Sequence, residues 1–516
     1  MTCGNARQAV GKAGGCQGLP CIDAAAMLSQ RHRCRIDAVS EGRAGGASLI
    51  GMSAYPYAAR FPVVGALPER GRPREDVLAE LAAIAAEEDA FWETGKCSGT
   101  MYCGDHDHYG FLTEAFGRFA HMNALQRDMC PSATKFEGEI IAMVLDVLGA
   151  DAVADGLPAG IVTTGGTGSI LHAMLAYREW GRTERGVRAP NVIKPETAHP
   201  AFDKAGHLFG IEVRRAPVDP VTTEVDLDWV AEHVDDATVA LIGSACNYGY
   251  GTIDPIGELS DLALRRGIGL HVDGCLGGLI LPFGRKLGYD IPAFDYELPG
   301  VTSISADTHK YGYSFKGSSV VTFRRRELRN ATYFYLTDWS GGKYCSPGIE
   351  GSRSGGLLAS TWAAMVQLGW DGYLRYARQI FEASARMQGA VRSHPELRMV
   401  GKPTFLFSFT ADEFDVYHVA DFMRPRGWRF NGQQYPNALH MAVTRPQTQP
   451  GVAEAFAADL AEAVSYARSK AGEPARSGAI YGGVAGGMTA EADDFIRSVM
   501  ADMMDAQQAV PADPAP

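Results

Sequence analysis

Residues 268–278, IGLHVDGCLGG, join a short apolar run to a carboxylate, because Asp273 ends the run and small residues follow it. Five similar runs, separated by helical patterns, lie at 161-IVTT-164, 191-NVIK-194, 239-VALIG-243, 301-VTSIS-305 and 319-SVVTF-323. This alternation predicts an α/β fold with a mixed, mostly parallel sheet and helices on both faces. Ligands of such sheets bind beyond the carboxyl ends of the strands, so functional side chains should follow these runs.

Helical periodicity is present on both sides of this region. Amphipathic patterns predict helices over residues 74–93 and 134–148, and again over 357–394 and 452–470. Between the last two, residues 400–445 alternate weakly between apolar and polar side chains, which is typical of strands. The carboxyl-terminal part is therefore expected to form a smaller α+β unit.

The chain has 516 residues with 48 basic and 60 acidic side chains, which gives a net charge of −12. This balance disfavours nucleic acid and anionic membranes as partners, so any phosphate binding must be local. Ten cysteines without a C-x-x-C pair indicate a reducing compartment. No apolar run approaches the ~20 residues of a membrane span, so we expect a soluble, cytoplasmic protein without a transmembrane anchor. Secretion into another cell stays open.

The stretch 163-TTGGTGSILHAML-175 is the first candidate for chemistry. A strand leads through Gly165, Gly166 and Thr167 into a helix, and the backbone amides and helix dipole at such a junction can hold a phosphate. The motif is neither a P-loop nor a dinucleotide fingerprint. A plain strand-to-helix turn is the alternative interpretation.

Two strand ends provide the other candidates. Asp273 could pair with a protonated ring nitrogen, as pyridoxal-phosphate enzymes require, or could simply cap a turn. In 303-SISADTHKYGYSFKG-317, Lys310 follows a buried strand, where desolvation could make its amine nucleophilic. A surface lysine is the alternative. Along the chain, the possible phosphate-binding turn at residues 165–167, called the phosphate cradle below, is followed by the strand-end carboxylate and then by the strand-end lysine. This order favours a pyridoxal-phosphate site.

The run D-T-H-K-Y-G-Y-x-x-K-G at residues 307–317, with H-V-D-G-C-L-G-G at 271–278, resembles the sphingosine-1-phosphate lyases. These are fold-type-I pyridoxal-phosphate enzymes of the group II decarboxylase superfamily. The resemblance covers roughly residues 75 to 500. Other matching stretches are 95-GKCSGTMYCGD-105, 163-TTGGTGSIL-171, 196-ETAHPAFDKA-205, 338-DWSGGKYCSPGIEGSRSGG-356 and 478-GAIYG-482.

The resemblance implies pyridoxal 5'-phosphate as the cofactor. Lys310 would be the Schiff-base lysine, Asp273 the partner of the pyridine nitrogen and His199 the residue that stacks on the ring. The implied contacts to the cofactor phosphate are Gly166, Thr167, His309 and, from the neighbouring subunit of a homodimer, Ser352.

The implied reaction is a retro-aldol cleavage of the C2–C3 bond of sphingosine 1-phosphate or a related phosphorylated sphingoid base. The products would be a long-chain aldehyde and phosphoethanolamine. Tyr102 and Lys316 would hold the substrate's phosphate. The base for the C3 hydroxyl stays open between Lys310, Tyr248 and that phosphate.

Two other functions are considered. An amino-acid decarboxylase of the same superfamily would need a cation for the substrate carboxylate, and the sequence identifies none. A catalytically silent binding protein is disfavoured because Lys310 and Asp273 are both present.

Three positions depart from the family pattern. Gly168 stands where the family's G-G-T-E-S has a glutamate, so a carboxylate beside the cradle is lost. Gln126 replaces a histidine that helps to bind the substrate phosphate, and Arg127 could compensate. Ser354 replaces the proline of G-S-R-P-G-G. The first two changes bear on which sphingoid base is accepted.

We expect five segments along the chain. These are a flexible extension (1–60), a helical segment contributing to the dimer and active site (61–125), a large cofactor-binding domain (126–395), a small domain (396–505) and a disordered tail (506–516). In 104-GDHDH-108, His106 and His108 would share one face of an extended segment. Because this segment coincides with the lyase-like entry to the substrate site, no metal is expected.

Overall fold

The computed structural model describes residues 55–478, 482–483 and 488–511. Residues 83–492 form one compact unit, and the residues before and after it are grouped separately. Most of the expected amino-terminal extension, residues 1–54, lies outside the described residues, as do residues 512–516 of the expected tail. The segment boundaries inside the compact unit stay a prediction.

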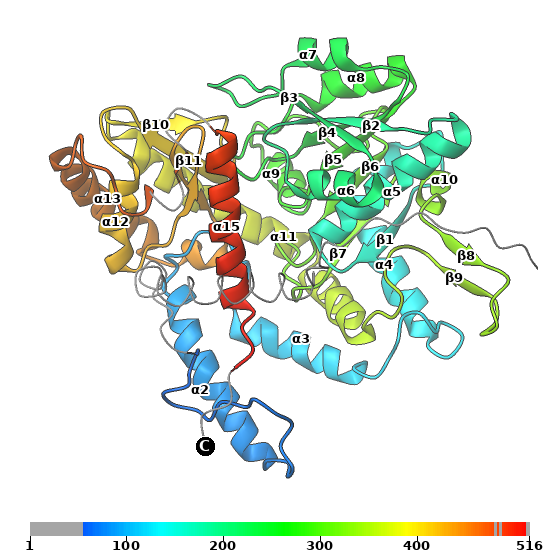
Figure 1. Cartoon of the computed structure of the whole chain (residues 1–516), viewed down its shortest axis with the longest axis horizontal. Helices are drawn as coiled ribbons and strands as arrows, with labels where there is room; N and C mark the ends of the chain where they lie inside the picture. Colours follow the sequence, from blue (N-terminus) through cyan, green and yellow to red (C-terminus); the bar gives the residue numbers. More distant parts are fainter. Residues whose placement is uncertain (1–54, 479–481, 484–487, 512–516) are drawn as a thin grey trace, which may run out of the picture. The chain divides into compact units, whose positions relative to one another are not determined.

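A seven-stranded sheet lies in the compact unit (Figure 1). Its strands are β1 (Ala159–Thr163), β2 (Asn191–Pro195), β3 (Glu212–Ala216), β4 (Thr238–Ser244), β5 (Gly269–Asp273), β6 (Ser303–Ala306) and β7 (Ser319–Phe323). They lie in the order β1-β7-β6-β5-β4-β2-β3, and every pair is parallel except that β7 runs antiparallel to β1 and β6. The predicted α/β fold with a mixed, mostly parallel sheet is confirmed.

Successive side chains of the central strands enter two different cores. Leu241 on β4 packs in the core that includes residues of helices α4 (Pro131–Val147) and α8 (Ile256–Arg266). Its neighbour Ile242 packs in the core that includes residues of α5 (Gly166–Glu184) and α6 (Ala201–Phe209). Because helices cover both faces, β4 and β5 are buried along their whole length, which explains their continuous apolar runs.

The remaining helices include those that the sequence periodicity predicts. They are α2 (Arg74–Trp92), α3 (His106–Arg118), α7 (Leu227–His233), α9 (Leu281–Lys286), α10 (Arg326–Asn330), α11 (Gly355–Arg392), α12 (Tyr417–Met423), α13 (Val452–Ser469) and α15 (Ala490–Gln507), with 3-10 turns η1 (Ala150–Ala152), η2 (Arg424–Arg426) and η3 (Arg445–Thr448). The four predicted helical patterns correspond to α2, α4, α11 and α13. Among the described residues, no helix is both long and apolar enough to cross a membrane.

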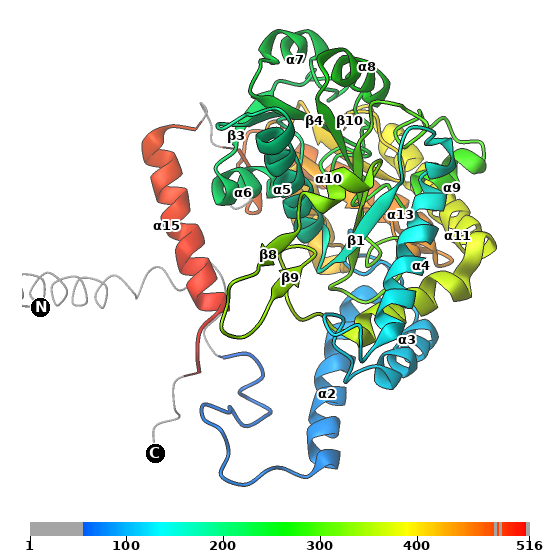
Figure 2. The same cartoon turned by 90° about the vertical axis from the view of Figure 1, so that its right-hand side faces the viewer.

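A second, four-stranded antiparallel sheet forms from the alternating section near the carboxyl end. It consists of β10 (Leu397–Val400), β11 (Leu406–Ala411), β12 (Asn431–Gln433) and β13 (Ala438–Ala442), in the order β10-β11-β13-β12. Its apolar side chains pack toward α13, as the ring contact between Phe407 and Phe456 illustrates. A separate hairpin of β8 (Phe334–Leu336) and β9 (Tyr344–Ser346) is visible from the side in Figure 2.

One strand of the large sheet was not among the predicted runs. β3 has the sequence EVRRA and lies at the edge of the sheet, next to β2 only. Its arginines, Arg214 and Arg215, form ion pairs with Asp235 and Asp203. Only Ala216 of β3 is buried, so this strand lacks the continuous apolar run by which the buried strands are recognised.

The buried carboxylate of Glu137 connects α4, β1 and the loop before α11. Glu137 on α4 accepts hydrogen bonds from the guanidinium of Arg353 at 2.9 and 3.0 Å, and from the backbone N–H of Val162 on β1 at 3.1 Å. Arg127 also pairs with it. Glu137 therefore fixes the loop before α11, which carries the G-S-R-S-G-G motif, against the edge of the sheet.

Replacing this carboxylate should destabilise the fold. In Glu137→Ala two arginines lose their counter-ion, and only 9% of the Arg353 side chain is exposed, so the free energy of unfolding should fall by about 3 kcal/mol. Chemical denaturation of the purified protein measures this loss. Glu114→Ala removes an exposed ion pair with Arg118 as the control, and it should change the same quantity by less than about 1 kcal/mol. Equal losses in both variants would contradict the expectation.

Candidate active site

A cavity of about 240 Å³ opens at the carboxyl ends of the central strands. Its lining brings together most of the predicted site residues. The lining residues are Tyr102, Gly166, Thr167, Ile170, His199, Ser244, Cys246, Tyr248, Asp273, Cys275, Leu276, Asp307, His309 and Lys310. Residues from separate parts of the sequence therefore meet where the rule for parallel sheets places a ligand.

The amino-terminus of α5 forms one wall of this cavity. Gly165 precedes the helix with φ of 144°, a conformation that side chains disfavour, and no side chain caps the helix. The N–H groups of the first turn have no acceptor within the helix, so they can bind an anion. A Cβ on Gly166 would lie 2.7 Å from the carboxylate of Asp307 and 3.0 Å from Cys275, so the close approach requires glycine.

Lys310 stands opposite this helix terminus. Its Nζ lies 2.9 Å from Oδ2 of the buried Asp307. Burial alone would lower the pKa of Lys310, but the charge of Asp307 and its hydrogen bond, together with the neighbouring Tyr102 and Cys275, outweigh burial and raise it. For Asp307, burial raises the pKa, but the positive charge of Lys310 and the hydrogen bonds from Lys310 and other neighbours together outweigh burial and lower it. Asp307 and Lys310 therefore form a charged pair near pH 7.

Asp273 is held in a defined orientation at the end of β5. Its Oδ1 accepts hydrogen bonds from the N–H of Cys275 at 3.1 Å and from the hydroxyl of Ser305 at 3.2 Å. Ser305 in turn lies 3.3 Å from Nε2 of His271, whose pKa burial lowers to about 4. Burial raises the pKa of the Cys275 thiol well above its usual range. This thiol is therefore a neutral packing group beside the carboxylate.

The two histidines of the cavity are both neutral near pH 7. Burial is the largest effect on His199 and on His309, and it lowers the pKa of each. His199 accepts a hydrogen bond from the N–H of Ala201 at 3.1 Å, which fixes its ring at the start of α6. His309 Nδ1 donates to the carbonyl of Ser318 at 2.6 Å. A neutral, oriented ring can stack on a flat ligand without adding charge.

The residues of this cavity fit pyridoxal 5'-phosphate. The first turn of α5 and Thr167 suit its phosphate, Asp273 suits its ring nitrogen, and Lys310 suits its aldehyde carbon. Asp307 Oδ1 is buried and has no hydrogen-bond partner among the described residues, which marks a place where the cavity is incomplete. The donor set is thus complementary to a phosphorylated pyridine.

A second cavity of about 360 Å³ adjoins the first, because Tyr102 and His309 line both. Lys316 lines it, with Nζ 4.5 Å from the centre of the Tyr102 ring and 2.9 Å from the carbonyl oxygen of Thr100. Burial, together with the positive charge of Lys310, lowers the pKa of Lys316 to about 8. Burial also raises the pKa of Tyr102 to about 12. Lys316 therefore places a cation in the cavity that adjoins the one lined by Lys310.

Two predicted site residues lie apart from both cavities. The hydroxyl of Ser352 accepts a hydrogen bond from the side chain of Asn123 at 2.9 Å, and Gln126 is exposed. Their sequence neighbours line a third cavity, of about 470 Å³, with Leu125, Arg127, Gly351 and Arg353 in its wall. Within a single chain, Ser352 and Gln126 are therefore near each other but not at the cofactor pocket.

A carboxylate from another part of the chain, that of Glu350, lies beside Gly168, where the family pattern has a glutamate. Glu350 Oε1 would lie 3.4 Å from a Cβ on Gly168, and it accepts a hydrogen bond from Thr164 at 2.9 Å. Its other oxygen lies 3.2 Å from Nε2 of His172. Burial raises the pKa of Glu350, but the contacts with His172 and Thr164 outweigh burial and lower it to about 2. Glu350 thus supplies a negative charge beside the phosphate cradle, where the sequence pattern alone predicted that one was lost.

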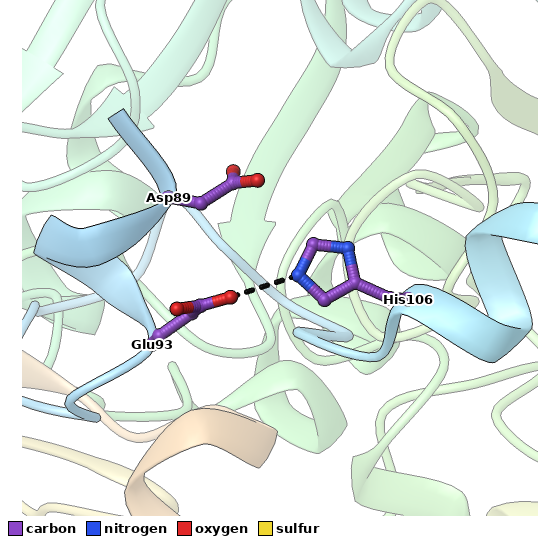
Figure 3. Close-up of side chains that lie close together, drawn as sticks. All are labelled: Asp89, Glu93 and His106. Atoms are coloured by element: carbon purple, nitrogen blue, oxygen red, sulfur yellow. Dashed lines mark hydrogen bonds and ion pairs between the residues drawn. The ribbon is translucent and has the colours of Figure 1, made fainter. Parts of the chain in front are cut away.

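The two histidines of 104-GDHDH-108 contact different parts of the structure. Asp105 caps α3, and the buried His108 donates from Nε2 to the carbonyl of Tyr313 at 2.8 Å. The exposed His106 instead meets the end of α2, where its Nε2 lies 2.9 Å from Glu93 and where Asp89 completes a cluster of three (Figure 3). The ion pair with Glu93 accounts for the orientation of His106.

Sequence reasoning assigned no role to Asp307, Ser305 or Glu350. Asp307 and Ser305 lie inside the quoted 303–317 motif, and their strand-end position was a signal that could have found them. Glu350 gave no such signal, because its partners Thr164 and His172 lie far away in the sequence.

Comparisons with known proteins agree with this geometry. Residues 61–409 match the pyridoxal-dependent decarboxylase conserved domain. The chain is 40% identical over 421 residues to the sphingosine-1-phosphate lyase of Dictyostelium discoideum, covering 81% of this chain and 78% of that one. The corresponding lyase of Arabidopsis thaliana is 41% identical over 424 residues, with 81% and 77% covered.

Solved structures give the same result. The sphingosine-1-phosphate lyase of Burkholderia pseudomallei has a TM-score of 0.80 and 60% identity, covering 81% of this chain and 96% of that chain. Lactobacillus brevis glutamate decarboxylase, at 18% identity, has a TM-score of 0.68 over 81% of this chain and 98% of its own, and shares the fold alone.

The fold and the site together define a pyridoxal-phosphate-dependent enzyme of the decarboxylase family. Decarboxylation and retro-aldol cleavage each break a carbon–carbon bond, and in this class of enzyme both use a Schiff-base lysine and a side-chain partner for the pyridine nitrogen. The chain belongs to the sphingosine-1-phosphate lyase family, which are carbon–carbon lyases.

A side chain at Gly166 should weaken cofactor binding. In Gly166→Ala the added Cβ would meet the Asp307 carboxylate at 2.7 Å, so the cradle must open and the dissociation constant for pyridoxal phosphate should rise about tenfold or more. Titration of the apoenzyme, followed by visible absorbance, measures it. Gly257→Ala, on α8 with nothing within 4 Å of the added Cβ, is the control and should bind like the unaltered protein. Equal affinity in both variants would show that Gly166 does not shape the cradle.

Proposed function

We propose that this protein cleaves the C2–C3 bond of a phosphorylated sphingoid base, such as sphingosine 1-phosphate, into a long-chain aldehyde and phosphoethanolamine. The observation that carries the proposal is the pair of adjoining cavities, one with Asp273 and Lys310 and the other with Lys316. A substrate amine at Lys310 and a substrate phosphate at Lys316 would use both. The names of the lyase relatives support the same substrate class.

Each residue of the first cavity has a defined task in this reaction. When bound, the cofactor supplies an electron sink for the bond that breaks. Asp273, aligned by Ser305, keeps a proton on the ring nitrogen and so maintains that sink. Lys310 holds the cofactor through its amine and returns a proton to the C2 side of the broken bond. His199 holds the ring in place by stacking.

The proton of the C3 hydroxyl needs an acceptor in the same cavity. Tyr248 lines that cavity, and its side chain is 46% exposed, so a substrate can reach it. Burial raises the pKa of Tyr248, so its phenol is protonated near pH 7. It can take up the C3 proton only while it donates its own proton to a base, and the neutral amine of Lys310, which lines the same cavity and later returns a proton to C2, can accept that proton. We propose Tyr248 for this step, with Lys310 and the substrate phosphate as the other chemically possible acceptors.

We further propose that the active protein is a homodimer whose sites lie at the subunit interface. Ser352 and Gln126 are separated from the cofactor pocket of their own chain, and they flank a third cavity with Asn123. A second copy could bring them to the phosphate groups of the first. The low cysteine content supports a cytosolic location.

The function is tested directly with sphinganine 1-phosphate. The purified protein, reconstituted with pyridoxal phosphate, should release equal amounts of fatty aldehyde and phosphoethanolamine, measured by mass spectrometry. Lys310→Ala should form neither product and should lose its visible cofactor absorbance on dialysis, because the covalent attachment is gone. Absence of both products from the unaltered protein would sink the substrate proposal. Carbon dioxide release from aromatic or acidic amino acids would instead favour a decarboxylase.

Lys316 should give the reaction a characteristic pH dependence. Its pKa of about 8 means that the cation is present below that pH and is lost above it, while the substrate phosphate stays doubly charged. KM for the phosphorylated base should therefore rise as pH increases from 7 to 9. Lys316→Gln should raise KM at pH 7 by about tenfold or more and abolish this rise. Lys135→Gln, which loses an exposed ion pair with Glu139, should keep the normal profile.

A further inference from the structure

The inner face of the small sheet is polar although it is buried. On β11, Phe407 and Phe409 point to the core near α13, and Ser408 between them must point to the other face. Ser408 lies directly opposite His440 on β13, so the two share that face. Both are 0% exposed. Polar side chains in such a position need partners, and the partners show what the face does.

The first partner is the loop of residues 246–251, which leads from β4 towards α8 and carries Tyr248. Ser408 Oγ and Gln433 Nε2 both donate to the carbonyl oxygen of Gly249, each at 2.6 Å. The ring of His440 lies against the ring of Tyr248, with 4.8 Å between centroids and 34° between planes. Three residues of the small sheet therefore contact Tyr248 and the residue after it: two bond the carbonyl of Gly249, and one packs against the Tyr248 ring.

The second partner is the loop that leads to Tyr102. The hydroxyl of Ser98 accepts from the N–H of Ala442 at 3.0 Å and lies 3.5 Å from Nδ1 of His440. The N–H of Gly99 donates to the carbonyl of Ala442 at 2.9 Å. One face of the sheet thus contacts both loops that bring tyrosines to the cofactor pocket.

The Tyr248 loop is also fixed at its far end. Thr404 Oγ1, just before β11, donates to the carbonyl of Gly251 at 3.2 Å, and the N–H of Tyr250 donates to Asn247 Oδ1 at 2.9 Å. Burial lowers the pKa of His440 to about 4, so its ring adds contact but no charge near pH 7. Because 46% of the Tyr248 side chain is exposed, surrounding core packing does not hold the phenol by itself. We therefore attribute the position of the Tyr248 phenol to the contacts from the small sheet.

We propose that Ser408, Gln433 and His440 are positioning residues that hold the phenol of Tyr248 at the C3 hydroxyl of the substrate. This inference rests on the proposed function, because it gives a structural reason for the assignment of Tyr248 to proton transfer. Proton transfer requires hydrogen-bond distance, and a displacement of about 1 Å can cost about a hundredfold in rate. The small sheet then acts in catalysis through the loop that it holds, without touching substrate.

The kinetic test compares donors on the same strand face. Ser408→Ala and Gln433→Met each remove one donor to Gly249, and each should lower kcat by about tenfold while KM and cofactor absorbance stay unchanged. Thr410→Val is the matched control, because Thr410 lies two residues from Ser408 and donates to the carbonyl of Asn437 at 2.6 Å, away from the loop. It should keep normal kcat. Loss of kcat in the control equal to that in Ser408→Ala would overturn the proposal.

A double-mutant cycle separates positioning from a general structural effect. In a Tyr248→Phe background, where no phenol is left to position, Ser408→Ala and Gln433→Met should lower kcat no further. The same fold-loss in both backgrounds would overturn the proposal. Gln433 is only half-buried, so its variant still gives an answer where Ser408→Ala fails to fold.

Hydrogen exchange tests the clamp without relying on activity. In the holoenzyme, both donor variants should speed amide exchange in a peptide covering residues 246–251, whereas Thr410→Val should not. Unchanged exchange in Ser408→Ala and Gln433→Met would overturn the clamp even if the enzyme cleaves its substrate. An unaltered protein that cleaves no phosphorylated sphingoid base would overturn the proposed function, and with it the role of Tyr248 in proton transfer, while the exchange result would still decide whether the clamp exists.

Discussion

The parallel register of β4, β5 and β6 is the constraint on which the site depends. It places Ser244, Asp273 and Ser305 in one row across the sheet, at the edge where all three strands end. Ser305 can therefore hold Asp273 by a hydrogen bond. A slip of one residue would turn Asp273 away from this row and disconnect it from its support, since side chains alternate between faces. Helices on both faces prevent that slip by burying every residue of these strands.

Local charge pairing explains how an acidic protein can prepare a site for two phosphates. The chain carries a net charge of −12, yet the cofactor pocket is built from a helix terminus, the Asp307–Lys310 pair and neutral histidines. Lys316 provides a cation in the adjoining cavity. At the physiological Debye length of about 8 Å, the distant surface acids are screened, and these neighbouring groups decide what binds.

Parts of the chain that are distant in sequence complete this local arrangement. Glu350 provides a carboxylate beside Gly168, and Glu137 fixes the loop that carries Arg353. The small sheet contacts the loops of Tyr102 and Tyr248 through a buried polar face. The small sheet therefore belongs to the active site in a structural sense, although none of its side chains lines the cofactor pocket.

The sequence by itself determined the central strands, the main helices and the core of the site, because these are local patterns. An apolar run followed by Asp273 or Lys310 is readable without knowing what lies beside it. Only the tertiary structure decided the antiparallel direction of β7, the exposed edge strand β3, the partner of Gly168 and the contacts of Ser408 and His440. Each of these depends on groups far apart along the chain. Chain direction in a sheet, the pairing of an isolated carboxylate and the covering of a polar face leave no periodic trace in the sequence, because packing alone creates them.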